Sequence, residues 1–468
     1  MTEAAPPSPP ASPSTFPPTF PPIARTIPEH IRQTLALAWP VVVSRASILI
    51  MVSVDVAMSG HAGQLQLAYV SIAMAIQVLF LMVGVGALFG TAVLVAQSHG
   101  AGEHAACGGI WRLAIMHAAG IGVISGLLCL GGGWFLLAIG HDADLARGGG
   151  RVLNQFSWGM VPMMMSVVTS MFLEAIGRPR PGMIVMVAAN FVNFGLNWLF
   201  IYGNWGAPEM GGEGAILATT IVRWLIFATL LTYIFVMPGS ADYGIRGGRR
   251  AAWSVGKKLR RIGYPMGFAQ GVEASAFSGL IMMAGYFGAA TLGGYQIAQN
   301  LIALTFMCAI GIGVATTVRV GNAIGRNDQP SVARAGWTGV GIVMIAMGLI
   351  ALVFEAIPET LVRVYTSDPS VISVSVTLVM IAGLVLVFDG AQGVLMAALR
   401  GTGDVWVPVC IQILAFGLIA LPVAAWLAFE VELGPPGLMA GMCAGVSTAS
   451  LLLGWRFRIV SQRVVRRL

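Results

Sequence analysis

The chain has 468 residues, of which 57% are hydrophobic and only 10% are charged, and its mean hydropathy is +0.83. Soluble domains carry roughly a quarter charged residues, so this composition excludes a soluble globular protein. The net charge of +7 does not indicate a nucleic-acid-binding protein, because the basic residues gather in a few short loops and the C-terminal tail, where they report orientation in a membrane.

The N-terminal residues 1–30 are dense in proline and contain no apolar run. Proline-rich segments stay extended and cannot bury enough apolar surface to fold. We therefore predict a disordered tail, and no cleavable signal peptide is visible in it.

Apolar runs of bilayer length fill the rest of the chain, since a hydrocarbon core of about 30 Å takes about 20 helical residues to cross. Their lengths, and the absence of strand-like alternation, predict an all-α membrane protein rather than a barrel. The twelve predicted spans lie near residues 34–59, 67–96, 108–140, 150–174, 182–203, 212–237, 262–287, 292–320, 333–356, 370–399, 407–429 and 436–457. Arginine and lysine occur in one set of alternate loops, acids in the other, so the positive-inside rule places both termini in the cytoplasm.

The chain also repeats itself. Pro40 and Pro265, like Gly100 and Gly325, are separated by the same 225 residues (265 − 40), and Glu103 is matched by an acid at the same offset. Two homologous bundles explain this pattern, and because each holds an even number of spans they are related by an axis along the membrane normal. We expect two pseudo-symmetric six-helix lobes around a central cleft, with an N-lobe at 31–238, a basic cytoplasmic linker at 239–261, a C-lobe at 262–457 and a basic tail at 458–468.

Three carboxylates lie inside these apolar spans: Asp55, Glu273 and Asp389. A charged side chain at the bilayer centre costs roughly 2.5 to 3.5 kcal/mol on insertion scales, so intramembrane acids usually have a function. Their default interpretation is a path for cations. The alternative is that they pair with Arg45, Arg223 or Arg319.

Polar side chains recur at helical spacing beside the two C-terminal acids. Gln270 precedes Glu273 by three residues, and Gln392 follows Asp389 by three, so each pair shares a helix face. The eighth span adds three further polar residues on one face, namely Gln296, Gln299 and Asn300. We expect these polar side chains to form a hydrated surface of oxygen ligands that faces the lobe interior. Such a surface would suit a hard cation such as Na⁺.

Several pieces in order resemble the multidrug and toxic compound extrusion family, specifically its bacterial NorM-like branch. They are Val54-Asp55-Val56-Ala57-Met58-Ser59-Gly60, Val95-Ala96-Gln97-Ser98-His99-Gly100, Arg319-Val320-Gly321-Asn322-Ala323-Ile324-Gly325 and Ala398-Leu399-Arg400-Gly401-Thr402-Gly403-Asp404. The likeness runs from about Leu35 to Trp455.

This resemblance implies a V-shaped antiporter that expels amphipathic, often cationic compounds while Na⁺ or H⁺ enters. The C-lobe cation site of that branch matches Glu273 and Asp389, and the N-lobe site matches Asp55 with Asn193 and Asn197. A proton competes with Na⁺, since burial favours a protonated carboxyl group. Glu174, at the end of its span near Arg178 and Arg180, is expected to form an interfacial ion pair.

Other functions fit these residues less well. A lipid-linked oligosaccharide flippase of the same superfamily remains an alternative. An integral membrane enzyme or a channel is a weaker alternative. No nucleophile and base constellation, GxxxxGK[ST] loop or spaced Cys/His cluster occurs, so we expect neither an enzyme nor a cofactor, and no metal apart from Na⁺ at Glu273 and Asp389. We expect a monomer in the bacterial inner membrane, with amphipathic or cationic small molecules, a monovalent cation and the bilayer as its partners.

Overall fold

The computed structural model describes residues 26–247, 253–463 and 467–468. Within these ranges every regular element is a helix and none is a strand, as predicted. The proline-rich tail falls almost wholly outside the described residues.

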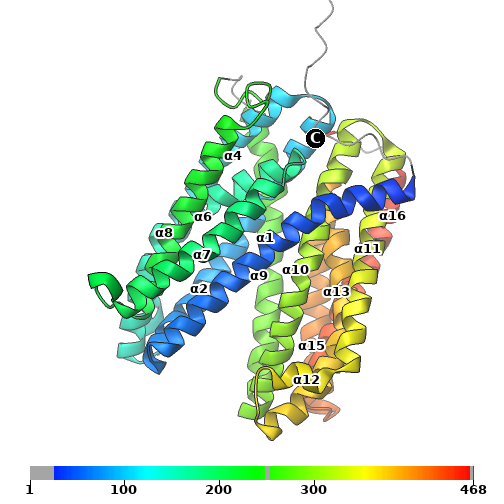
Figure 1. Cartoon of the computed structure of the whole chain (residues 1–468). Coiled ribbons are helices and arrows are strands. Elements are labelled where there is room, and N and C mark those ends of the chain that lie inside the picture. Colours follow the sequence, from blue (N-terminus) through cyan, green and yellow to red (C-terminus); the bar gives the residue numbers. More distant parts are fainter. Residues whose placement is uncertain (1–25, 248–252, 464–466) are drawn as a thin grey trace, which may run out of the picture.

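Two lobes make up the molecule (Figure 1). The N-lobe contains α1 (Ile27–His61), α2 (Gln64–Leu88), α3 (Gly90–Gly100), α4 (His104–Leu130), α5 (Gly132–Ala138), α6 (Ala143–Ala175), α7 (Arg180–Tyr202), the short η1 (Asn204–Gly206) and α8 (Gly212–Val236). The C-lobe contains α9 (Trp253–Gly285), α10 (Ala289–Gly325), α11 (Gln329–Ala356), α12 (Pro358–Arg363), α13 (Pro369–Thr402), α14 (Trp406–Gln412), η2 (Ile413–Ala420), α15 (Leu421–Ala425), η3 (Trp426–Glu430) and α16 (Pro435–Gln462).

Local sequence sets where several helices begin and end. The side chains of Asp142 and Asp368 accept hydrogen bonds from the first backbone N–H groups of α6 and α13, which helix starts leave unsatisfied. At the other end of α13, Gly403 takes a left-handed conformation with φ of 83°, which glycine adopts without strain. Acids in the loops therefore cap helices.

A central helix organises each lobe. In the N-lobe α6 packs against α2, α4 and α8, and in the C-lobe α13 packs against α10, α11 and α16. Large apolar side chains on the outer helices are exposed, among them Trp134, Phe191 and Leu418. Such a surface is stable only in lipid, where the helices satisfy their own backbone hydrogen bonds.

Eleven helical segments of the described chain are long and apolar enough to cross a membrane. The predicted count of twelve is not confirmed. The seventh predicted span, 262–287, corresponds to α9, which ends at Gly285 and begins at Trp253, so that it takes in the basic residues 253–261 of the predicted linker. Likewise α16 continues to Gln462, into the predicted tail.

The lobes meet near one end of the molecule, here called the closed end, and diverge away from it in Figure 1. There α1 packs against α10, and α2 and α3 pack against α9 and α10. Glycines permit this close approach: a Cβ atom at Gly86 would lie 2.6 Å from the Cα atom of Gly267, and one at Gly263 only 1.8 Å from the carbonyl oxygen of Ala87. No larger residue fits at these positions without moving the helices apart.

The same contact is made twice across a pseudo-twofold axis. A Cβ atom at Gly100 would meet the carbonyl oxygen of Asn322 at 2.3 Å, and one at Gly325 would meet that of Gln97 at 2.1 Å. Gly100 and Gly325 are matched by the repeat, and so are Gln97 and Asn322. The repeat predicted from sequence is therefore also the symmetry of the interface between the lobes.

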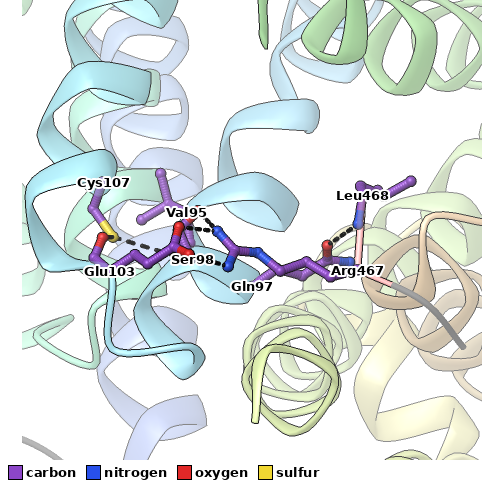
Figure 2. A network of polar contacts seen from close by, with 7 residues as sticks. All are labelled: Val95, Gln97, Ser98, Glu103, Cys107, Arg467 and Leu468. Carbon is purple, nitrogen blue, oxygen red and sulfur yellow. Dashed lines mark hydrogen bonds and ion pairs between the residues drawn. The ribbon is translucent and has the colours of Figure 1, made fainter. Parts of the chain in front are cut away.

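A polar network adds to this contact (Figure 2). The guanidinium group of Arg467, beyond the end of α16, donates to both carboxylate oxygens of Glu103 and to the hydroxyl of Ser98 in the N-lobe. The backbone N–H of Leu468 donates to Oε1 of Gln97 at 3.1 Å, while Nε2 of Gln97 donates to the carbonyl of Gly401 in α13 at 3.2 Å. Chain segments from both lobes thus share hydrogen bonds at the closed end.

Candidate functional site

The N-lobe carboxylate, Asp55, is only 1% exposed and is fully hydrogen-bonded. Nδ2 of Asn197 donates to its Oδ1 at 2.7 Å, and the hydroxyl of Thr219 donates to its Oδ2 at 2.6 Å. Asn193 completes a ring, since its Oδ1 accepts from Asn197 at 3.1 Å and its Nδ2 lies 3.1 Å from the Thr219 hydroxyl. The structure therefore brings together the three residues of the predicted N-lobe site, Asp55 from α1 and Asn193 and Asn197 from α7.

The C-lobe acids lie in a sparser environment. Oε2 of Glu273, a partly exposed residue of α9, accepts a hydrogen bond from Nε2 of Gln412 at 3.3 Å. Oε1 of Gln412 in turn accepts from Nε2 of Gln392 at 3.2 Å. Asp389 is 2% exposed, and the charge of Glu273 acts on it. Glu273 and Asp389 therefore lie in one electrostatic neighbourhood, and two glutamines connect Glu273 to the face of α13 that carries Asp389.

Two buried oxygen atoms of this neighbourhood have no hydrogen-bond partner among the described residues, Oδ1 of Asp389 and Oε1 of Gln392. The two side chains are one helical turn apart on α13. A buried carboxylate without a partner is costly, and binding of a proton or a cation removes that cost. Two carboxylates and amide oxygens are suitable ligands for either a proton or a hard cation.

The alternative that these acids pair with arginine is not what the structure shows. In the described residues no salt bridge joins an arginine to Asp55, Glu273 or Asp389. Arg223 lies near enough to Asp55 to act on it electrostatically, whereas Arg319 donates to the hydroxyl of Thr34 and to the backbone of residue 30. Asp55 and Glu273 therefore accept hydrogen bonds from neutral groups, and none of the three acids forms an ion pair with arginine among the described residues.

Comparison with known proteins places this arrangement in a family. The MatE family model matches residues 40–199 and 265–426, one stretch in each lobe. The probable multidrug resistance protein NorM of Caulobacter vibrioides is 32% identical over 432 residues, covering 92% of each chain. The chain belongs to the multidrug and toxic compound extrusion (MATE) family. It is thus a member of a family of multidrug efflux transporters with transmembrane helices.

Further relatives agree with this assignment. The probable multidrug resistance protein NorM of Rhodopseudomonas palustris is 31% identical over 436 residues and covers 91% of each chain. A solved structure described as the outward-facing conformation of a multidrug resistance MATE family transporter of the MOP superfamily superposes with a TM-score of 0.86 at 16% identity. That match covers 93% of this chain and 96% of the other, so the MATE fold extends over nearly the whole molecule.

The remaining predicted site residues of this MATE transporter are less closely associated with the acids. Gln270 and Gln299 are half-buried, and Gln296 and Asn300 are exposed. Oδ1 of Asn300 accepts a hydrogen bond from the hydroxyl of Tyr365 at 3.0 Å, in the loop after α12. Gln392 is the predicted glutamine that joins the hydrogen-bonded C-lobe network. The role of the others stays a prediction.

Sequence reasoning missed two residues that contact the acids, Thr219 and Gln412. Each stands in a strongly apolar span, where a polar residue is a signal of a partner. Threonine hydroxyls usually bond to their own helix, however, and neither residue is at helical spacing from the acid it contacts. Only the packing of α8 on α1, and of α14 on α9, brings them there.

Glu174 forms an ion pair as predicted, but its partner is neither Arg178 nor Arg180, beside which the sequence placed it. Its Oε1 lies 3.5 Å from Nη2 of Arg45 on α1, while Arg178 donates to the carbonyl of Pro238. α6 ends at Ala175 and Gly177 takes a left-handed conformation with φ of 78°, so Arg178 does not continue the helix that carries Glu174. Across the described residues no group of three or more His, Cys, Asp or Glu side chains gathers into a metal site.

Proposed function

We propose that this MATE transporter is a secondary antiporter, not an enzyme, that exports amphipathic, often cationic compounds while Na⁺ or H⁺ enters. It acts by alternating access as a monomer in the bacterial inner membrane. Both termini, and therefore the closed end, face the cytoplasm. Contact of the lobes at that end supports an outward-facing state.

One observation carries the coupling proposal: Asp389 is buried with an unpartnered carboxylate oxygen beside a second acid, Glu273. In the N-lobe, both carboxylate oxygens of Asp55 already accept hydrogen bonds. The C-lobe pair therefore gains more from an entering cation, and we assign the coupling step to it. Neutralising the pair on one side of the membrane then shifts the balance between the two lobe arrangements.

The test replaces each C-lobe acid by its amide in protein reconstituted into liposomes. We expect Glu273→Gln and Asp389→Asn each to reduce gradient-driven export of an organic cation at least about tenfold, within the usual range of coupling between sites. Imposing a sodium gradient and a pH gradient separately identifies the ion. Glu430→Gln, at an exposed acid of the same lobe, is the matched control and should export normally.

Full export by both amide variants would show that the C-lobe pair does not couple transport. By linkage, the coupling ion should also weaken binding of the exported cation to the unmodified protein at equilibrium. An ion that leaves this binding unchanged is not the coupling ion.

A further inference from the structure

Arg400 extends from the C-lobe into the N-lobe. It lies near the end of α13, is 8% exposed, and its guanidinium carbon stands 3.9 Å from the ring centre of Phe89. Phe89 belongs to the other lobe, at the junction of α2 and α3. Nη2 of Arg400 also lies 3.2 Å from the hydroxyl of Thr317 in its own lobe. The positive group thus covers an aromatic face across the interface.

The buried carboxylate of Glu174 is electrostatically coupled to Arg400. Glu174 is 7% exposed, and the charges of both Arg45 and Arg400 act on it. Arg45 comes from the same lobe as Glu174, and Arg400 from the opposite lobe. Glu174 and Arg400 occupy equivalent repeat positions, each three residues before a left-handed glycine, Gly177 or Gly403. The repeat therefore has a negative group in one lobe and a positive group at the equivalent position of the other.

The cluster is not fully satisfied in the closed arrangement. Among the described residues Glu174 pairs with Arg45 at 3.5 Å and forms no ion pair with Arg400, and the buried Nε atoms of both Arg45 and Arg400 lack a hydrogen-bond partner there. A permanent interior ion pair is stable when its remaining donors are paired. Here the arginines of both lobes keep an unpaired buried donor, which suits a contact that forms and breaks.

An aromatic face beside a carboxylate is the usual protein seat for an organic cation, since the ring quadrupole and the negative charge both attract it. We propose that Phe89 and Glu174 form such a seat in the N-lobe, and that Arg400 occupies it only while the closed end is shut. When the lobes part there, the seat takes an aromatic ammonium compound from the cytoplasm. When they close, Arg400 displaces that cation toward the far side. This inference rests on the proposed alternating access.

The test measures equilibrium binding, without any gradient, so that it stands apart from the export assay. The probe is radiolabelled phenyltrimethylammonium, dialysed against purified full-length protein in detergent. Removing the competitor with Arg400→Gln should lower the Kd about tenfold while slowing export. Adding Phe89→Leu to that variant should cancel the gain, since a desolvated cation–π contact contributes on the order of a tenfold effect. Adding Glu174→Gln should do the same.

Three controls distinguish a cation-binding seat from a contact that only holds the lobes together. Arg246→Gln removes an exposed arginine–aromatic contact between the linker and the N-lobe, where the guanidinium carbon is 6.0 Å from the Phe235 ring, and should leave the Kd unchanged. Arg400→Lys keeps the competing charge and should bind the probe like the unmodified protein, which also covers the case that Arg400→Gln does not fold. The neutral isostere tert-butylbenzene should gain no affinity in any variant.

An unchanged Kd in a folded Arg400→Gln protein overturns the proposal, and so does a gain that survives Phe89→Leu. Slower export without tighter binding would show that Arg400 only clamps the lobes. If the unmodified protein fails to export in liposomes while the binding results are as expected, the proposed antiport is wrong. The proposed cation-binding seat is then still supported.

Discussion

At the residue scale, the two lobes treat their carboxylates differently. Asp55 accepts short hydrogen bonds from Asn197 and Thr219, whereas Asp389 has an oxygen atom that accepts none from the described residues. A buried anion is stabilised by charge-assisted hydrogen bonds, which are roughly twice as strong as neutral ones. We therefore interpret the Asp55 ring as a stable structural element and the Glu273–Asp389 pair as the reactive one.

The Asp55 interpretation predicts a difference between two adjacent threonines. Thr219→Val leaves a buried carboxylate short of a donor and should lower the free energy of unfolding by about 1.5 to 3 kcal/mol. Thr220→Val removes only a neutral bond, the 2.9 Å contact from its hydroxyl to the carbonyl of Gln155, and should cost about 0.5 to 1.5 kcal/mol. Thermal unfolding in detergent compares the two. Equal losses would show that Asp55 is not held as an anion.

At the element scale, glycines decide how closely helices of opposite lobes approach. The backbone of α3 meets that of α10 at Gly100 and Gly325, and α2 meets α9 at Gly86 and Gly267. Because the opposing atoms are backbone atoms, a side chain added there cannot be accommodated by a change of rotamer. The helices themselves must separate.

Gly100→Ala should therefore open the closed end, since its Cβ atom would lie 2.3 Å from the carbonyl oxygen of Asn322. The measurement is the distance between spin labels at exposed positions near the starts of α4 and α11, in a background without the five native cysteines. We expect a longer mean distance or a larger open population. Gly120→Ala, at an exposed helical glycine with nothing within 4 Å, is the control. Identical distributions for both variants would exclude a sealing role for Gly100.

At the scale of the whole molecule, residues from distant parts of the chain hold the closed end together. Arg467 reaches Glu103 and Ser98 of the N-lobe (Figure 2). The hydrogen bonds from Arg467 hold the pKa of the Glu103 carboxyl below its usual 4.5, and Glu103 raises the pKa of Arg467. Stability from a lowered carboxyl pKa is present above the ordinary value and is lost as pH falls through the lowered one. This contact should therefore be insensitive to pH near neutrality.

Charge exchange tests this contact. Glu103→Arg and Arg467→Glu should each increase the open population at the closed end in the same spin-label measurement, and the double exchange should largely restore closure. Because both side chains are partly exposed, high salt should weaken the effect. Changing the pH between about 6 and 8 should not alter the contact, since the ordinary pKa values of both groups lie outside this range. Failure of the double exchange to restore closure would show that the pair is incidental.

The sequence by itself determined the membrane-embedded helical fold, the internal repeat and the three intramembrane acids. Composition and apolar run length allow no other fold class, and the repeat offset alone links Gly100 with Gly325. It also placed Asp55 with Asn193 and Asn197, through resemblance to the family.

Only the tertiary structure decided which partners those acids have. Thr219 and Gln412 reach them from other helices, and Glu174 pairs with Arg45 of α1 instead of with its neighbours in sequence. The physical reason is that sequence spacing specifies which residues share a face of one helix, while contacts between helices depend on rotation, tilt and glycine-limited distance. These are properties of packed pairs of helices, and no single helix encodes them.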